Sequence, residues 1–303
     1  MKFEVTILGS GSAVPTTKRN PAGQIVNIHE TYLLIDCGEG TQLRLKESAV
    51  KMQRIRYVFI SHLHGDHFFG LPGLLSTLHL LGREKPLDIF GPPGLKNAVM
   101  GMVELGRDYL RYELNFHETK DDQSNLLVDR KSFQVWSFPL LHKIPTTGFW
   151  IKEKPKKRHY DPNAGLRYDV PIHWIDRIKS GMDFVNEAGE VVPNHLLTSP
   201  AEVSKSYAYC SDTAFFPELE QYLQEPDVLY HESTFLESEK ARANETKHST
   251  AKQAAEMALR LKSKCLVLGH FSARYRKEEK FKSEAEQIFN NVVIAYDGLV
   301  INP

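Results

Sequence analysis

The sequence lacks the features that mark membrane, secreted and disulfide-rich proteins. No apolar run approaches the roughly 18 residues that a transmembrane helix needs, and the first residues carry no apolar core of a secretion signal. Only three cysteines occur, Cys37, Cys210 and Cys265, and their spacing fits neither a disulfide framework nor a Cys-x-x-Cys zinc knuckle. We therefore expect buried, reduced thiols in a cytoplasmic protein with no membrane partner.

The chain also lacks net charge. Its 38 Lys and Arg balance 38 Asp and Glu, which excludes a protein held to nucleic acid by bulk positive charge but not one with a local basic patch. There is no internal repeat and no low-complexity tract. With 303 residues, 41% of them hydrophobic, the composition is that of an ordinary globular protein of one large domain or two smaller ones.

Short apolar strands alternate with helical segments along most of the chain, which predicts the α/β class. Strands are expected at 3–8, 24–28, 32–36, 56–61, 87–90, 133–138, 206–210, 227–230 and 265–268. Helices are expected over 74–81 and after Ser249 or Thr250, where alanines recur with the 3.6-residue period.

One stretch breaks this alternation and predicts an insertion. It begins near residue 151 with five basic residues against one acidic residue over 152–158, followed by prolines and aromatics. We expect a core whose first half is 1–150 and whose second half is 201–303, with 151–200 as an inserted flexible arm.

Residues that bind metals follow the ends of several predicted strands. Four lie within 62–67, and three others each follow a separate strand. The candidates are His62, His64, Asp66, His67, His142, Asp212 and His270. Imidazoles mixed with carboxylates favour Zn²⁺ or a similar transition metal. Seven ligands exceed the needs of one tetrahedral ion, so they predict two ions, with Asp212 as the natural bridge.

Six segments of the chain carry recognisable motifs. One is His-Leu-His-Gly-Asp-His at 62–67, and the others are 15–20, 34–40, 231–234, 248–250 and 269–275. The first resembles the H-x-H-x-D-H signature of the metallo-β-lactamase superfamily, and the other five resemble motifs of its short-form ribonuclease Z (tRNase Z) family. Two features depart from the family pattern: the Lys of the first loop sits one place later than usual, and the arm lacks a Gly-Pro-rich tip.

The resemblance implies a metallo-β-lactamase-like αββα sandwich of two mixed sheets with an inserted arm. It also implies a homodimer that acts on precursor tRNA as a zinc-dependent endoribonuclease. Such an enzyme cleaves off the 3′ trailer, leaving a 3′-hydroxyl on the tRNA and a 5′-phosphate on the trailer. Two zinc ions per subunit are implied, one held by His62, His64, His142 and Asp212, the other by Asp66, His67, His270 and Asp212.

The resemblance further suggests catalytic roles. Asp66 would take or orient the proton of the attacking water. Glu232 and His248 are candidates for protonating the leaving ribose oxygen. The alternative for Glu232 is a hydrogen bond to a ligating histidine, and the alternative for His248 is a structural role at a helix N-terminus beside Ser249. Asp36 would orient ligands without binding metal.

Substrate binding is expected at two places. The loop with Lys18, Arg19 and Asn20 would hold phosphates or the 3′ end near the metals. The arm would add sequence-independent phosphate contacts. Its basic candidates are Lys154, Lys156, Lys157 and Arg158. The pairs 68–69 and 215–216, all phenylalanine, are expected to pack the site walls and not to stack on bases.

Two other functions remain open from the residues. One is a superfamily hydrolase acting on a thioester, lactone, sulfate ester or small phosphodiester. The other is a metal- or RNA-binding protein without catalysis. The basic arm disfavours the first, because a small substrate needs no arm, and the complete ligand set disfavours the second.

Overall fold

The computed structural model describes residues 2–105 and 110–303, which form two compact units. The first contains Met1–Lys152 and Lys205–Pro303, and the second is the insert Glu153–Ser204. The sequence places these boundaries at 150/151 and 200/201. No helix among the described residues has the length and apolar character to cross a membrane.

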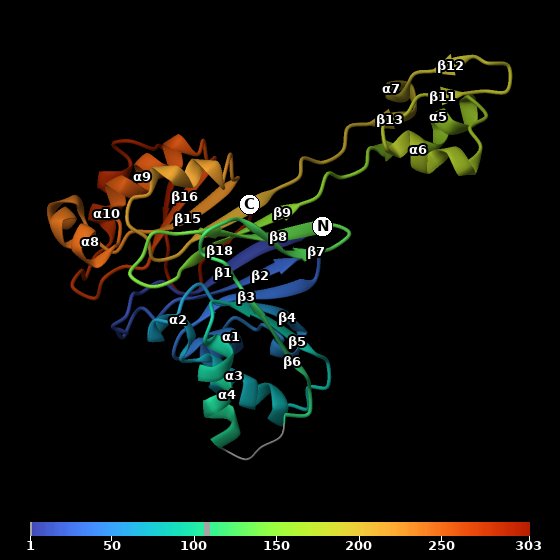
Figure 1. The fold of residues 1–303 in the computed structure, drawn as a ribbon. Helices are drawn as coiled ribbons and strands as arrows, with labels where there is room; N and C mark the ends of the chain where they lie inside the picture. The colour runs from blue at the N-terminus through green and yellow to red at the C-terminus, as the bar shows by residue number, and fades with distance from the viewer. Residues whose placement is uncertain (1, 106–109) are drawn as a thin grey trace. The chain divides into compact units, whose positions relative to one another are not determined.

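The core unit contains two seven-stranded mixed sheets (Figure 1). The first has the order β18 (Val300–Ile301), β1 (Phe3–Gly9), β2 (Gly23–Ile28), β3 (Thr31–Cys37), β4 (Ile55–Phe59), β5 (Leu87–Gly91) and β6 (Leu114–Glu118). Its strands pair antiparallel from β18 to β3 and parallel from β3 to β6. The second has the order β17 (Val292–Ile294), β16 (Cys265–Gly269), β15 (Val228–Glu232), β14 (Ser206–Cys210), β9 (Thr147–Glu153), β8 (Phe133–Pro139) and β7 (Asn125–Asp129). Here β14 to β17 are parallel, and β9 joins β14 antiparallel.

Helices cover the outer faces of the two sheets (Figure 1). On the first sheet lie α1 (Thr41–Glu47), α2 (Gly65–Phe68), α3 (Leu71–Leu80) and α4 (Leu95–Leu105). On the second lie α8 (Lys240–Thr246), α9 (Ala251–Arg260) and α10 (Glu279–Ala285). Short 3-10 turns occur at Met52–Arg54, Pro217–Gln221 and Glu237–Glu239. This layering confirms the predicted αββα sandwich.

A continuous apolar core joins the two sheets. Phe59 stacks on Phe90 within the first sheet at 5.0 Å between ring centroids, and it meets Phe149 of the second sheet at 5.3 Å. A second cluster packs the first sheet against its helices, with Leu74 and Val99 fully buried. Burial of such side chains contributes roughly 1.5–3 kcal/mol each, so the sandwich holds the strand ends in fixed positions.

The nine predicted strands are all present, with ends displaced by at most two residues. Thr250 is the N-cap of α9 and forms a capping box with Gln253, as the alanine periodicity predicts for a helix that starts there. The cysteines are free thiols; Cys37 and Cys210 are buried, as expected, whereas Cys265 is half-buried.

The insert has a small core of its own. Its elements are β10 (His159–Tyr160), α5 (Pro162–Arg167), a 3-10 turn (Ile172–Trp174), α6 (Ile175–Lys179), β11 (Phe184–Val185), β12 (Val191–Val192), α7 (Asn194–Leu197) and β13 (Thr198–Ser199). Ile178, Phe184 and Leu197 are buried together, and Trp174 packs edge-on against Phe184 at 5.3 Å.

Candidate metal centre

Parallel pairing brings the predicted ligands to one edge of the sandwich. Asp212 and His270 follow the carboxyl ends of β14 and β16, which lie on either side of β15 in one parallel run. His62 follows β4 of the other sheet, and residues 64–67 form the start of α2. The C-terminal ends of parallel strands are where α/β proteins form sites, so distant segments converge here.

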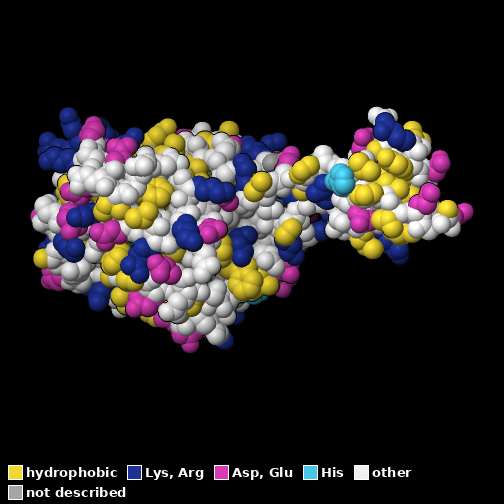
Figure 2. All heavy atoms as spheres, turned by 90° about the horizontal axis from the view of Figure 1, so that it is seen from above, with side chains coloured by type: hydrophobic (Ala, Val, Ile, Leu, Met, Phe, Trp, Pro, Cys, Tyr) yellow, Lys and Arg dark blue, Asp and Glu magenta, His cyan; other side chains and the backbone are white. Residues whose placement is uncertain are grey.

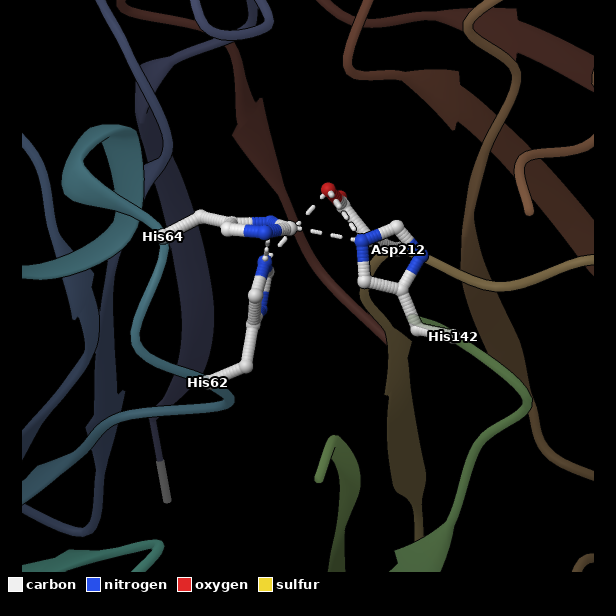
Figure 3. Close-up of side chains that lie close together, drawn as sticks. All are labelled: His62, His64, His142 and Asp212. Carbon is white, nitrogen blue, oxygen red and sulfur yellow. Dashed lines mark hydrogen bonds and ion pairs between the residues drawn. The ribbon is translucent and has the colours of Figure 1, made fainter. Parts of the chain in front are cut away.

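The first ligand group consists of His62, His64, His142 and Asp212, whose candidate ligand atoms lie within 4.8 Å of one another (Figure 3). His64 Nδ1 lies 3.0 Å from His62 Nε2 and 3.3 Å from His142 Nε2. Nitrogens at tetrahedral positions around one zinc ion would be separated by about 3.3 Å, given Zn–N distances of about 2.0–2.1 Å. The nitrogen spacing therefore fits a shared metal ion.

Burial keeps these imidazoles in the neutral form that binds metal. It lowers the pKa of His62 to about 4, and it also lowers the pKa values of His64 and His142. Asp212 Oδ2 lies 3.5 Å from His62 Nε2 and 3.9 Å from His142 Nε2, which supplies a carboxylate to the same group.

The second group contains Asp66, His67 and His270. Asp66 Oδ2 lies 3.4 Å from both His67 Nε2 and His270 Nε2. The other oxygen of Asp212, Oδ1, lies 3.1 Å from His270 Nε2 and 3.5 Å from His67 Nε2. Asp212 therefore turns one oxygen toward each group.

Among the residues that the structure describes, two buried polar atoms at this second group form no hydrogen bond: His67 Nε2 and Oδ1 of the adjoining Asp212. Leaving a buried polar atom unpaired costs about 1–3 kcal/mol, so both atoms require another ligand. A lone pair on an imidazole nitrogen and one on a carboxylate oxygen, side by side, suit a transition-metal ion. The residues present thus fit a metal ion in each group.

Asp36 holds one of these ligands in position. This carboxylate is fully buried and accepts hydrogen bonds from Ser61 N at 2.8 Å, Ser61 Oγ at 2.9 Å and Tyr209 OH at 2.7 Å. It also accepts from His67 Nδ1 at 2.8 Å, which leaves His67 Nε2 directed at the second group. Sequence reasoning missed Tyr209, although a tyrosine in the buried strand that precedes Asp212 is a signal for a polar contact inside the core.

Glu232 is fully buried, and hydrogen bonds occupy both of its carboxylate oxygens. Oε1 accepts from Thr213 N, Ser249 N and His248 Nδ1, the last at 2.7 Å. Oε2 accepts from the N–H and the hydroxyl of Thr234, both at 2.9 Å, and the Thr234 hydroxyl also contacts His270 Nδ1 at 2.9 Å. Glu232 thus contacts His248 directly and reaches His270 through Thr234.

His248 lies between Glu232 and the ligand groups. Its Nε2 lies 4.0 Å from Asp212 Oδ2, and its ring stacks on that of His270 at 5.6 Å. Burial disfavours the charged imidazolium, but the carboxylates of Glu232 and Asp212 outweigh this effect and raise the pKa of His248 to about 9. His248 lines the cavity around the two groups, together with His64, Asp66 and His142.

The loop with Lys18, Arg19 and Asn20 is anchored to the C-terminal part of the chain. Arg19 is only 7% exposed; its guanidinium is paired with Glu278 and donates to Tyr275 O at 2.7 Å. The side chain of Asn20 donates to Asp297 Oδ2 at 2.8 Å. Lys18 is exposed and lines a separate cavity with Arg19, so it is the member of this trio whose side chain is available to a ligand.

The basic residues of the insert are largely engaged within it. Lys156 pairs with Glu153 and Glu202, Lys157 with Asp176, and Arg158 Nε donates to Thr198 Oγ1 at 2.7 Å. Lys154 is half-buried. Residues 153–204 contain seven Lys and Arg against eight Asp and Glu, so the insert as a whole is not basic. Over the face shown in Figure 2, basic and acidic side chains are interspersed.

The two phenylalanine pairs differ from each other. Phe68 is buried, and Phe215 and Phe216 pack against the main core, as expected for wall residues. Phe69 is 61% exposed, which is more than its predicted place in the site wall implies. The reason is geometric, because Phe69 follows the last residue of the one-turn helix α2, where its ring covers Gly65 and not the core.

Comparison with known proteins places this architecture among a group of nucleases. Proteins named ribonuclease Z from Bacteroides thetaiotaomicron and Parabacteroides distasonis are 45% and 44% identical to the chain; the alignments cover 99% and 98% of it and 95% and 98% of the relatives. The short form of human tRNase Z has a similar structure, with a TM-score of 0.73 and 30% identity over 99% of this chain and 98% of that one. The Bacillus subtilis protein YhfI shares the fold, with a TM-score of 0.70 and 17% identity over 99% of both chains. A family model described as anti-Pycsar protein Apyc1 matches residues 3–129, less than half of the chain.

Proposed function

The chain belongs to the ribonuclease Z family, and we propose that the two ligand groups joined by Asp212 form the centre with which it cuts precursor tRNA. The protein is a hydrolytic endoribonuclease of tRNA 3′ processing. The observation that supports the site assignment is the pair of buried, unpartnered atoms, His67 Nε2 and Asp212 Oδ1, within the second ligand group.

We propose two zinc ions per chain. His62, His64, His142 and Asp212 would hold one, and Asp66, His67, His270 and Asp212 the other. Such ions would lower the pKa of a water molecule and offset the charge that develops on the phosphoryl oxygens.

The chain's own residues supply the proton transfers. Asp66 lies at the cavity beside His67 and His270, and we assign it the role of orienting the attacking water and accepting its proton. Burial alone would raise the pKa of Asp66, but the neighbouring His67 and His270 lower it, which keeps this carboxylate ionised.

His248 is our candidate for protonating the leaving ribose 3′-oxygen. Its Nδ1 is committed to Glu232 Oε1, so the proton that can reach the cavity is on Nε2. Glu232 accepts hydrogen bonds on both oxygens and does not line the cavity, so it serves as a positioning residue that holds His248 and stabilises its charge. The products of this step are a tRNA with a 3′-hydroxyl and a trailer with a 5′-phosphate.

Lys18 and the insert are proposed to contact precursor tRNA, and the protein is proposed to act as a homodimer in the cytoplasm. Arg19 and Asn20 would contribute by holding the loop that carries Lys18. Sedimentation of the purified chain tests the dimer directly.

Cleavage of a labelled precursor tRNA with mapped ends, beside hydrolysis of bis(p-nitrophenyl) phosphate, tests the activity and the site together. We expect a single cut with a 3′-hydroxyl on the tRNA, and loss of both reactions in His64→Ala. The matched control is His117→Ala. This change removes an exposed histidine of β6 that pairs with Asp88 of β5, and it should alter neither reaction. Hydrolysis of the small diester without any cut in tRNA would contradict the proposal and favour a small-substrate hydrolase.

A further inference from the structure

The cavity at the metal centre is lined by three Lys and Arg side chains that lie outside the ligand groups. Lys143 and Arg242 line this cavity of about 550 Å³, and both are exposed. Within the described part of the chain, neither side chain makes an ion pair. Arg274, which also lines the cavity, is by contrast bonded to Glu239 at 3.1 Å and lies over the ring of Phe235. Lys143 and Arg242 therefore retain uncompensated positive charge where the substrate must enter.

Both residues belong to the side of the cavity formed by His142 and His248. Lys143 directly follows His142, whose Nδ1 contacts the carbonyl oxygen of Lys247 at 2.8 Å. Lys247 is the C-cap of α8, the helix that carries Arg242. The rings of His142 and His248 are 5.0 Å apart. Lys18, in contrast, lines a separate cavity together with the rest of 16–19 and with Ala273, Tyr275, Arg276 and Glu278.

This arrangement fixes the 5′-to-3′ orientation of the RNA strand in the cavity. The inference rests on the proposed function, in which His248 protonates the leaving oxygen. That oxygen is the 3′-oxygen of the last tRNA nucleotide, so the tRNA side of the scissile bond lies toward His248. We propose that Lys143 and Arg242 bind the backbone phosphates immediately 5′ of the cut, in the last nucleotides of the mature tRNA. An ammonium and a guanidinium are both phosphate ligands, and such contacts fix position without reading bases.

The first test removes the charges while keeping side-chain length, in Lys143→Gln, Arg242→Gln and the double variant. Each single change should raise KM for precursor tRNA about two- to fivefold and reduce the log–log salt slope of binding by about one unit. Hydrolysis of bis(p-nitrophenyl) phosphate and the metal content should stay unchanged. Lys240→Gln is the matched control, because it removes one positive charge from the same helix at a residue outside the cavity lining.

The second test locates the contacts with precursor tRNAs that carry a single uncharged methylphosphonate linkage. In the wild type, the uncharged linkage should reduce kcat/KM when it lies 5′ of the cut, and the double variant should not respond to it. The proposal would be overturned if the wild type and the double variant differed in their response to an uncharged linkage in the trailer. It would also be overturned if they responded alike to uncharged linkages on both sides of the cut. Loss of small-diester hydrolysis or of metal in the double variant would also overturn it, since the two residues would then support the site itself. A wild-type protein that leaves precursor tRNA intact would instead refute the proposed function on which this inference rests.

Discussion

Asparagine in place of Asp36 would remove one charge beside the second ligand group without removing a proposed ligand. The backbone tolerates this change, because Asp36 has a φ of +53° and asparagine adopts the left-handed region about as readily as aspartate. The side chains have the same size. Any change in stability or metal binding therefore comes from the lost charge of the Asp36 carboxylate and from its altered hydrogen bonds.

The expected magnitude follows from the donors around Asp36. Its Oδ2 faces three of them, on His67, Ser61 and Tyr209, whereas Oδ1 faces Ser61 N–H. The amide carbonyl of asparagine will take the Oδ2 position, and the amide NH₂ will then oppose Ser61 N–H, at a cost of about 1–3 kcal/mol in folding stability. Loss of the carboxylate behind His67 should weaken metal binding in the second group by about 10- to 100-fold.

Competition with a chromogenic zinc chelator measures this effect. At a chelator concentration at which the wild type retains two ions, Asp36→Asn should retain one. The matched control is Asp88→Asn, which removes a carboxylate paired with His117 at 3.2 Å, remote from the ligand groups, and should retain both ions. If Asp36→Asn binds both ions as tightly as the wild type, then Asp36 does not act on the metal through His67.

Three further predictions concern metal, proton transfer and the insert. Elemental analysis should find about two zinc ions per chain, and removing them should abolish cleavage; one ion or none in fully active protein would contradict the two-metal assignment. His248→Gln should slow precursor-tRNA cleavage by about 10²–10⁴-fold, and Glu232→Gln should slow it by less. Hydrolysis of a nitrophenyl diester should change little in either variant, because its leaving group needs no proton. Equal losses on both substrates would exclude the role in protonation. Replacing 154–203 by a short Gly/Ser linker should leave nitrophenyl-diester hydrolysis intact, because no proposed metal ligand lies in the insert. The same change should weaken precursor-tRNA binding in a filter assay. Unchanged binding would show that the insert does not contact the substrate.

The fold and the ligand groups could be predicted because their signals are local. A strand such as β4 is a short apolar run, and the residues at 62–67 follow it directly. The parallel order of β14, β15 and β16 then brings Asp212 and His270 together without any further information from the sequence. The helix after Thr250 is equally predictable, because its N-cap residue and its alanine periodicity both lie within ten residues of sequence.

Whether each Lys or Arg is paired with an acidic side chain could not be predicted, because the partners lie far away in the sequence. Arg19 is neutralised by Glu278, which lies 259 residues later. Lys156 is paired with Glu202 across the whole insert. A run of positive charge in the sequence therefore says little about the field that a substrate meets, whereas an isolated residue such as Lys143 can remain uncompensated.

This distribution of charge bears on how a chain with no net charge can bind a polyanion. Long-range attraction is weak when opposite charges are interspersed over the surface, so affinity must come from the few cations that lack partners at the point of contact. Lys143 and Arg242 line the cavity at the metal centre, and Lys18 is exposed on a neighbouring loop. Because each neutralised phosphate adds about one unit to the salt slope, binding near the cut should depend only modestly on salt. Selectivity for precursor tRNA must then rest on the shape of the substrate and the position of its 3′ end more than on charge.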